Sequence, residues 1–378
     1  MTPFERPERK VPRVALLGCG DVAMRRYVPA LLELAGRVDV VACCDARIEL
    51  AEHAAVACRR VFPDTAAFAA SDALFASCDV DALFNLTPIP LHGETTTAAL
   101  EAGVHVFTEK PLASSLEEAD RLIDLARSRS RLLMSAPAVA LSPRIRWLRE
   151  VVESGRLGVP TLAIGSICGL GAAAWREYTG HAGAAYTIVG GPLLNMGIYA
   201  LHAFVELLGP VRAVQAMGEI AIPHRKIRDG RYAGETVDVT APDQFLVHLD
   251  FGEGRFADLV ATYAVPAARA PWLELHLTGG SVSVGADTQW DADGPVDVFL
   301  DDSGPLALEG WLEEARARPD EPGNVVGLGP QHFVNVLVGD AESALPVERA
   351  RHVLEVCLRA VDSSRDGRTH VIGLPTAA

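Results

Sequence analysis

Gly18-Cys19-Gly20-Asp21-Val22-Ala23 has the spacing G-x-G-x-x-A and directly follows an apolar run that reads as a β-strand. In this pattern the first glycine permits a tight turn, the second lets a pyrophosphate approach the backbone, and the small third residue packs helix on strand. The helix that begins here offers free N–H groups and the positive end of its dipole to phosphate oxygens. The glycines alone could serve a structural turn, but their place after the first strand favours a dinucleotide-binding loop. We therefore expect five residues of this loop at the cofactor: Gly18, Gly20, Asp21, Val22 and Ala23.

A carboxylate, Asp45, ends the second apolar run, Val40–Cys44. At the end of the second strand an acid accepts hydrogen bonds from the ribose hydroxyls of NAD and repels the 2′-phosphate of NADP. Asp45 could instead cap the helix that begins near Arg47, and one carboxylate can do both. Arg47 itself would soften a preference against NADP. The sequence predicts NAD as the cofactor, with NADP less favoured.

Two further polar segments follow apolar strands. Thr87, Pro88 and His92 come after one strand, and Glu109 and Lys110 come after the next. Because open parallel sheets bind ligands at the carboxyl ends of their strands, we expect all five at the cofactor. Lys110 stands out because only three of the 34 basic residues are lysines. Its ammonium can hydrogen-bond a reacting oxygen and stabilise negative charge there, whereas the alternative is a lysine on a solvated turn.

An apolar helix in the second half of the chain carries a polar stripe. Asn195, Tyr199 and His202 are spaced i, i+4 and i+7, which places them on one face of an α-helix. Such a stripe points to a ligand or to an internal hydrogen-bond network, and His202 fits helix packing better than a role as base. Trp175 and Arg176 precede this helix, and the guanidinium could grip a carboxylate or phosphate, although the tryptophan can equally pack within the domain. We expect these five residues at the substrate.

The elements that must position the first group alternate along the chain. The expected strands are 11–17, 38–44, 80–86, 104–108 and 132–135, and the expected helices are 22–35, 48–59, 93–102 and 116–128. Buried strands separated by helices imply a parallel, doubly wound α/β sheet of the Rossmann kind. We place this dinucleotide-binding domain at residues 1–135.

Beyond residue 140 the pattern changes. A helix is expected at 143–155, strands at 160–168, 244–251, 255–265, 273–277 and 281–284, and a final amphipathic helix at 347–364. The Gly/Pro-rich segment 318–330 reads as a surface loop. Consecutive hairpins imply a C-terminal α+β domain, residues 136–378, with a large open, mostly antiparallel sheet. This domain carries Asn195 and Tyr199, so we expect it to bind substrate. Because one face of such a sheet must be covered, we also expect it to mediate self-association.

Composition excludes several classes of protein. The net charge of −15 disfavours nucleic acid and anionic lipid as partners, and no apolar run is long enough to span a membrane. The seven cysteines show neither zinc spacing nor C-x-x-C pairs, so we expect no metal site and a reduced, cytoplasmic protein.

Taken together, the ordered motifs resemble the glucose–fructose oxidoreductase/inositol dehydrogenase (Gfo/Idh/MocA) family over nearly the whole chain. The matching segments are GCGDVA, Asp45, LTPIPLH, AALEAGVHVFTEKPLA, GGPLLNMGIYALH and VLEVCLRAVDSSRDGR. The resemblance implies NAD(P)-dependent hydride transfer on a secondary alcohol or ketone of a sugar, aminosugar or cyclitol, including nucleotide-activated sugars. It places Lys110 beside the nicotinamide and the substrate hydroxyl, and it implies a homodimer or homotetramer.

Two departures from the family pattern bear on mechanism. Members commonly carry Asp where this chain has Asn195, and an amide cannot accept a proton at neutral pH. The proton role would then fall to Tyr199 assisted by Lys110, with Asn195 orienting groups at the catalytic centre. The segment 135–140 also lacks the polar residues of many relatives. A redox-neutral epimerase or eliminase with retained NAD, or a non-catalytic NAD-binding sensor, are the alternatives.

Overall fold

The computed structural model describes residues 4–176, 178–285, 296–300, 312–314 and 324–373. These residues form two compact units. The first contains the chain up to Ala138 together with Val326–Arg351, and the second contains Val139–Val325 and the residues from His352 on. The segment 326–351 thus clusters with the N-terminal residues. The domain boundary at residue 135 stays a prediction, because domains defined by sequence need not coincide with such units.

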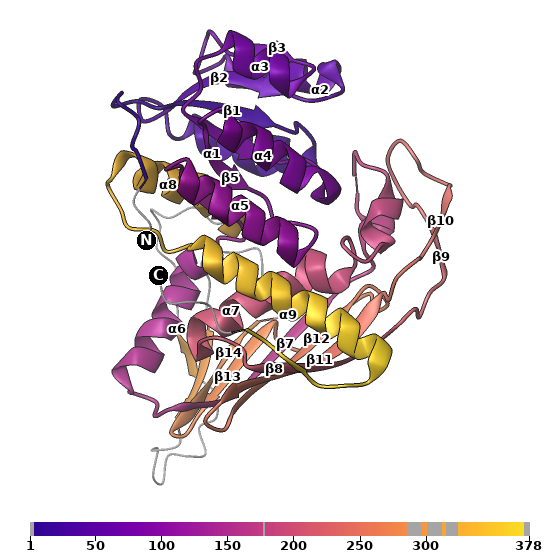
Figure 1. Cartoon of the computed structure of the whole chain (residues 1–378). Helices are drawn as coiled ribbons and strands as arrows, with labels where there is room; N and C mark the ends of the chain where they lie inside the picture. The colour runs from indigo at the N-terminus through magenta and orange to yellow at the C-terminus, as the bar shows by residue number, and fades with distance from the viewer. Residues whose placement is uncertain (1–3, 177, 286–295, 301–311, 315–323, 374–378) are drawn as a thin grey trace. The chain divides into compact units, whose positions relative to one another are not determined.

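The first unit is built on six parallel strands in the order β3-β2-β1-β4-β5-β6 (Figure 1). The strands are β1 (Arg13–Leu17), β2 (Asp39–Cys44), β3 (Ala66–Phe68), β4 (Ala82–Asn85), β5 (His105–Thr108) and β6 (Leu133–Ser135). The helices between them are α1 (Val28–Leu32), α2 (Ile48–Cys58), α3 (Ser71–Ser77), α4 (His92–Glu101) and α5 (Leu116–Ser128). This strand order confirms the predicted doubly wound fold, in which the chain starts at the centre of the sheet and works outward in both directions.

The helix after the glycine loop is irregular. Residues 21–32 are helical, but Ala23–Tyr27 form a π-helical turn, η1, before the α-helical part begins. The predicted helix at 22–35 is therefore too long at its end and too regular at its start. A π turn holds an extra residue, so the 3.6-residue period that the prediction assumed does not apply across it.

An aromatic cluster fills one side of the first sheet. Phe84 on β4, Phe107 on β5, Tyr27 and Phe333 lie with ring centroids 5.5–6.2 Å apart in tilted and edge-to-face contacts. Phe333 belongs to helix α8 (Val325–Val338), which corrects the expectation of a surface loop over residues 325–330. The rest of that expected loop, up to residue 323, lies outside the described residues.

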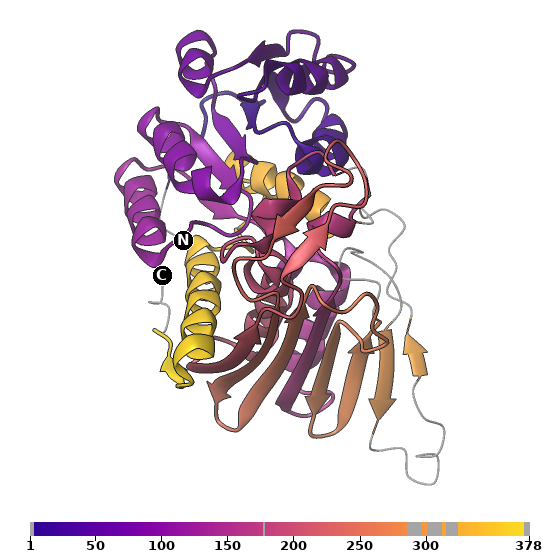
Figure 2. The ribbon, with the colours of Figure 1, turned by 90° about the vertical axis from the view of Figure 1, so that its right-hand side faces the viewer.

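The second unit contains a mixed sheet of nine strands in the order β16-β15-β14-β13-β7-β12-β11-β8-β17 (Figure 2). The strands are β7 (Pro160–Cys168), β8 (Ala213–Glu219), β11 (Gln244–Gly252), β12 (Arg255–Thr262), β13 (Leu273–Leu277), β14 (Gly280–Val284), β15 (Val296–Leu300), β16 (Leu312–Glu314) and β17 (His370–Val371). Their pairings are antiparallel except that of β7 with β12, which is parallel. The prediction of a large, mostly antiparallel sheet is confirmed.

Buried and exposed side chains alternate along the strands, so this sheet has one covered face and one exposed face. On β11, Phe245, Val247, Leu249 and Phe251 are all buried, as the sequence pattern predicts. The helices of this unit are α6 (Pro143–Ser154), α7 (Ile198–Leu208) and α9 (Val347–Asp366), the last of which continues from the first unit. Helix α9 packs beside β8, where the Ala216 N–H donates to the Ser363 hydroxyl at 2.9 Å (Figure 2).

A second, smaller sheet pairs β9 (His224–Lys226) with β10 (Thr236–Asp238). Short helical turns lie between β7 and α7: η4 (Ala172–Ala174), η5 (Ala182–Tyr186) and η6 (Leu193–Gly197). Turn η6 is π-helical and runs directly into α7. The helix that was predicted to carry the polar stripe therefore also starts with a widened turn.

Candidate active site

The glycine loop adopts the conformation that its motif predicts. Gly18 has a φ of +92° and its N–H donates to the Cys44 carbonyl at 2.8 Å, which turns the chain out of β1. A Cβ at Gly18 would lie 2.5 Å from the carbonyl oxygen of Leu86, so the loop backbone and the segment after β4 need this glycine. At Gly20, by contrast, a Cβ would meet nothing within 4 Å. That open space beside a helix start fits a pyrophosphate approaching the backbone.

The other residues of the loop differ in exposure. Val22 is 44% exposed, Ala23 is buried, and the Asp21 carboxylate lies 3.7 Å from the Arg25 guanidinium. The buried Ala23 packs as the motif requires of its small third residue. The exposed Val22 and the half-buried Asp21 leave the first helical turn accessible.

The Asp45 carboxylate is hydrogen-bonded to the backbone of the glycine loop and of the turn before α2. One carboxylate oxygen accepts from the Cys19 N–H at 2.8 Å, and the other accepts from the Arg47 N–H at 2.9 Å. Arg47, not Asp45, is the N-cap residue of α2, so Asp45 acts as a turn residue before the helix. Each carboxylate oxygen has a second lone pair, and a half-buried acid at this sheet edge can still accept from ribose hydroxyls. The geometry fits NAD at this loop.

The segment after β4 is fastened by side chains. Asn85 is fully buried; its amide donates to the Thr95 and Thr96 hydroxyls at 2.7 and 3.0 Å, and its carbonyl oxygen accepts from the Thr87 hydroxyl at 2.7 Å. Asn85 thereby fixes Thr87 and leaves Pro88 exposed at the end of the strand. Asn85 is not among the predicted site residues, and an amide at the end of an apolar strand is the signal that could have singled it out.

His92 joins the two segments that follow β4 and β5. It is 1% exposed, with Nδ1 2.7 Å from the Pro111 carbonyl oxygen and Nε2 2.9 Å from the Thr87 carbonyl oxygen. Burial lowers the pKa of His92, while the two carbonyls oppose that shift. Since both ring nitrogens face backbone, the structure favours a positioning role over the predicted direct contact with the cofactor.

Lys110 follows β5 and belongs to a short chain of polar contacts. The Tyr27 hydroxyl donates to one Glu109 carboxylate oxygen at 2.8 Å, and the backbone N–H of Lys110 donates to the other at 3.0 Å. Burial lowers the pKa of the Lys110 ammonium to about 8, and the Glu109 carboxylate partly opposes the shift. A lysine with this pKa can hold or release a proton near neutral pH. Tyr27, on the π turn, was missed because its spacing reads as ordinary helix core.

In the second unit, Asn195 and Tyr199 lie in different surroundings. Asn195 is half-buried on turn η6, and its amide donates to the Tyr263 hydroxyl at 2.9 Å. Tyr199 and His202, on α7, are 3% and 6% exposed. The single polar face predicted from a 3.6-residue period assumed regular helix, which does not hold across Leu193–Gly197.

The two residues predicted upstream are at the surface. Trp175 is 37% exposed and contacts Tyr178 edge-to-face with ring centroids 5.4 Å apart. Arg176 is exposed. Their contact with substrate stays a prediction.

A buried network around Tyr263 was missed altogether. Arg225 forms an ion pair with Asp243, with side chains 6% and 1% exposed, and donates to the carbonyl oxygen of Tyr263 at 2.7 Å. Asp243 also accepts from the Ala221 N–H at 2.7 Å. The Arg225 guanidinium lies over the Tyr186 ring, with its Cζ atom 5.1 Å from the centroid of that ring. These residues are far apart in sequence and share no motif, so no local signal could have grouped them.

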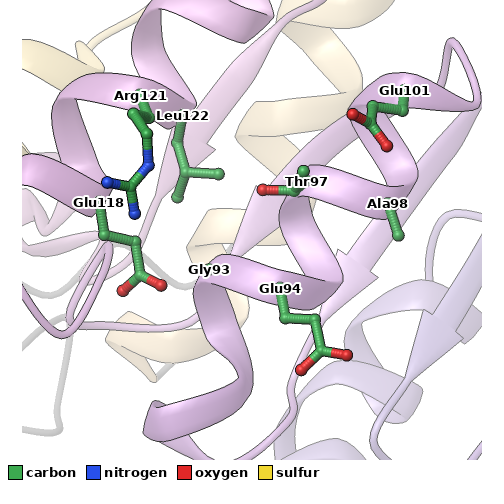
Figure 3. Close-up of a pocket in the computed structure, with 8 residues that line it drawn as sticks. All are labelled: Gly93, Glu94, Thr97, Ala98, Glu101, Glu118, Arg121 and Leu122. Atoms are coloured by element: carbon green, nitrogen blue, oxygen red, sulfur yellow. The ribbon is translucent and has the colours of Figure 1, made fainter.

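A cavity of about 400 Å³ lies elsewhere in the first unit, between α4 and α5 (Figure 3). Glu94 and Thr97 project from α4, and Glu118 and Arg121 from α5. None of the predicted cofactor residues lines this cavity. It is therefore not the dinucleotide site.

Within the described ranges, no group of three or more His, Cys, Asp or Glu is arranged to hold a metal ion. In the same part of the chain no helix is both long and apolar enough to cross a membrane. The seven cysteines are free thiols.

Comparison with known proteins places these motifs in a family. Residues 12–136 match the model of an oxidoreductase family with an NAD-binding Rossmann fold, and residues 145–283 match the GFO/IDH/MocA C-terminal domain. A dTDP-3,4-didehydro-2,6-dideoxy-alpha-D-glucose 3-reductase from Actinomadura kijaniata is 30% identical over 66% of this chain and 71% of its own length. The chain therefore belongs to the Gfo/Idh/MocA oxidoreductase family, as the motifs predicted.

The share of a relative's length that this chain matches differs between the other relatives. The enzyme of the same name from Streptomyces violaceoruber is 33% identical over 52% of this chain, which spans only 54% of that relative. A D-glucoside 3-dehydrogenase from Escherichia coli K12 is 25% identical over 89% of this chain and 97% of its own length. Among solved structures, the WlbA dehydrogenase from Bordetella pertussis, in complex with NADH and UDP-GlcNAcA, has a TM-score of 0.70 at 20% identity and covers 97% of this chain and 100% of that one. The named relatives are sugar oxidoreductases, and the structural match shows the shared fold.

Proposed function

We propose that this protein is an NAD(H)-dependent oxidoreductase that reversibly reduces a ketone on a sugar ring, with carbon 3 of a nucleotide-activated hexose as the preferred position. The main observation behind this proposal is Lys110, which follows β5 in the same unit as the glycine loop. Burial lowers the pKa of its ammonium to about 8. The dTDP-sugar 3-reductase and the D-glucoside 3-dehydrogenase support carbon 3 as the reacting position, because both names specify that carbon of a sugar. When bound, NAD(H) supplies or accepts the hydride.

The residues of the chain have separate tasks in this proposal. Gly18 and Gly20 bind the pyrophosphate, and Asp45 binds the adenosine ribose and disfavours a 2′-phosphate, so NAD is preferred to NADP. Lys110 hydrogen-bonds the reacting oxygen and stabilises negative charge on it. Tyr199 exchanges the proton with that oxygen, and Asn195 orients the sugar, because an amide does not take up a proton. Glu109 and Tyr27 keep Lys110 in place.

The test is a turnover assay with defined substrates. dTDP-3,4-didehydro-2,6-dideoxy-α-D-glucose is offered with NADH or NADPH, methyl D-glucoside with NAD or NADP, and the absorbance of reduced nicotinamide is followed. We expect consumption of NADH with the ketosugar, faster than of NADPH. Conversion of a sugar with no net change in NADH would instead support a redox-neutral epimerase or eliminase.

The exposed face of the second sheet supports a homodimer or homotetramer. Met217 on β8, Leu246 on β11 and Phe256 on β12 are 70%, 49% and 52% exposed, and Leu246 pairs with Met217 across the sheet. Apolar side chains gathered on one face mark an interaction surface. Light scattering should give a dimer or tetramer mass for the wild type and a monomer mass for Met217→Glu/Leu246→Glu. A wild-type monomer would refute the assembly.

A further inference from the structure

The Tyr263 side chain is held rigidly inside the second unit. It is 3% exposed, directly follows β12, and its backbone N–H donates to the Asp243 carbonyl at 2.7 Å. Its own carbonyl accepts from Arg225 at 2.7 Å, and its ring meets Tyr186 edge-to-face with centroids 5.9 Å apart. Two backbone hydrogen bonds and one ring contact thus hold the main chain and the ring of Tyr263 in place.

The hydroxyl proton of Tyr263 has a direction set by Asn195. A phenol oxygen can accept one hydrogen bond while its own hydrogen is donated elsewhere. Here the oxygen accepts from the Asn195 amide at 2.9 Å, so the hydrogen must point away from that amide. In the described part of the chain the structure gives this hydrogen no acceptor. An aspartate at position 195 would do the opposite, because a carboxylate would take the phenol hydrogen itself.

The protonation state of Tyr263 suits a donor. Burial raises the pKa of the phenol, and the hydrogen bond from Asn195 opposes this only in part. The phenol therefore stays protonated throughout the pH range in which enzymes of this class work, so it cannot serve as a base. A buried donor without an acceptor costs free energy, and an oxygen of a bound ligand removes that cost.

We propose that Tyr263 is a substrate-binding residue whose hydroxyl donates a hydrogen bond to a hydroxyl or carbonyl oxygen of the sugar, and that Asn195 positions it by donating to its oxygen. The inference rests on the proposed function for the class of ligand. It assigns a role to the amide at position 195: the amide donates to the Tyr263 oxygen and so leaves the phenol hydrogen to a ligand, whereas a carboxylate would accept that hydrogen itself.

Dead-end complexes allow binding to be measured without turnover. The full-length protein is saturated with NAD and titrated calorimetrically with dTDP-3,4-didehydro-2,6-dideoxy-α-D-glucose, for the wild type, Tyr263→Phe, Asn195→Asp and the double variant. Loss of one hydrogen bond to a neutral oxygen should raise the sugar Kd about 2- to 10-fold in Tyr263→Phe, with the Kd for NAD unchanged. Asn195→Asp should weaken sugar binding clearly when Tyr263 is present and much less in the Tyr263→Phe background. Both changes remove the same donor, the Tyr263 hydroxyl hydrogen.

Tyr186→Phe is the matched control in the same aromatic pair. The Tyr186 hydroxyl donates to the Leu170 carbonyl at 2.9 Å and accepts from the Ala173 N–H at 3.0 Å, so both its hydrogen-bonding roles are filled within the protein. This variant should lower Tm and leave the sugar Kd within about twofold of the wild type. The inference is overturned if Tyr263→Phe binds the sugar as the wild type does, or if Tyr186→Phe weakens binding equally.

The wild type and the Tyr263→Phe variant, measured for both sugar binding and turnover, distinguish a failure of this inference from a failure of the proposed function. Sugar binding that depends on Tyr263, without NADH consumption in the turnover assay with the ketosugar, would refute the hydride-transfer function and support the role of Tyr263. NADH consumption with a sugar Kd that does not respond to Tyr263→Phe would support the function and refute the role of Tyr263.

Discussion

The candidate residues of the two units are held in place by different parts of the chain. In the first unit, backbone geometry dominates: Gly18 turns with a positive φ, and Asp45 accepts from the Cys19 and Arg47 N–H groups. In the second unit, side chains have this role: the Asn195 amide donates to the Tyr263 hydroxyl, and Arg225 of the buried Arg225–Asp243 pair donates to the Tyr263 carbonyl. A backbone-built site needs particular residues at fixed short spacing, whereas a network of side chains can be assembled from any part of the sequence. The two sites should therefore fail in different ways when they are mutated.

The largest effect is expected from breaking the buried ion pair. Arg225→Met leaves the Asp243 carboxylate buried without its cation, so the free energy of unfolding should fall by about 3–5 kcal/mol. Urea denaturation measures this loss, and a Kd for NADH that stays unchanged in the folded protein would show that only the second unit is affected. The exposed Arg231→Met is the matched control and should have little effect. A loss below about 1 kcal/mol would contradict the role given to the pair.

Removing the amine of Lys110 should damage catalysis without damaging the fold. Lys110→Met should lower kcat by about 10²–10³-fold, since the charge on the reacting oxygen loses its partner, while the Kd for NADH changes little. Because the Lys110 pKa is lowered to about 8, the protonated form predominates below that pH and is lost above it. Wild-type kcat/KM for reduction should therefore fall as the pH rises through about 8.

Lys226→Met is the matched control, because it makes the same lysine-to-methionine change at an exposed position on β9. It should keep wild-type kcat and the wild-type pH profile. If Lys110→Met kept more than about a tenth of the activity, Lys110 would not act on the reacting oxygen.

The two glycines of the loop sharpen the contrast within the first unit. Gly18→Ala places a Cβ 2.5 Å from the Leu86 carbonyl oxygen at a φ of +92°, and should cost about 2–3 kcal/mol of stability. Gly20→Ala meets open space, so Tm should hold while the Kd for NADH rises roughly 10-fold, because the pyrophosphate loses its close approach. Thermal melts and fluorescence titration with NADH distinguish the two, and equal behaviour of both variants would refute the assignment.

The smallest effect concerns the choice of cofactor. Asp45→Ser removes the charge that repels a 2′-phosphate, so the preference for NADH over NADPH in kcat/KM should fall about 10-fold. The exposed Asp64→Ser carries the same change of charge away from the loop and should leave the preference as it is. An unchanged ratio in Asp45→Ser would mean that this carboxylate serves only the backbone of the glycine loop.

The same contrast explains what the sequence could predict. Strands and helices follow short apolar periods in both units, and helix α5 of the first unit and strand β7 of the second have the predicted bounds. Residues 325–330 were predicted as loop because Gly327, Gly329 and Pro330 lie within a few positions. In the fold they begin α8, where a Cβ at Gly329 would lie 2.7 Å from the Phe107 ring, so close packing overrides local preference. The network of Arg225, Asp243 and Tyr263 joins three segments through tertiary contacts alone, which no local pattern records.

Both units begin a site helix with a π turn, Ala23–Tyr27 in one and Leu193–Gly197 in the other. Such a turn holds one residue more than an α-turn. An α-turn closes with about four residues and the π turn at Leu193–Gly197 holds five, so deleting one residue within it would leave α7 nearly unrotated and would change only the side chains inside the turn. Gain or loss of a single codon is thus a short evolutionary step by which a helix of this kind changes the side chains of its first turn while the rest of the helix keeps its faces.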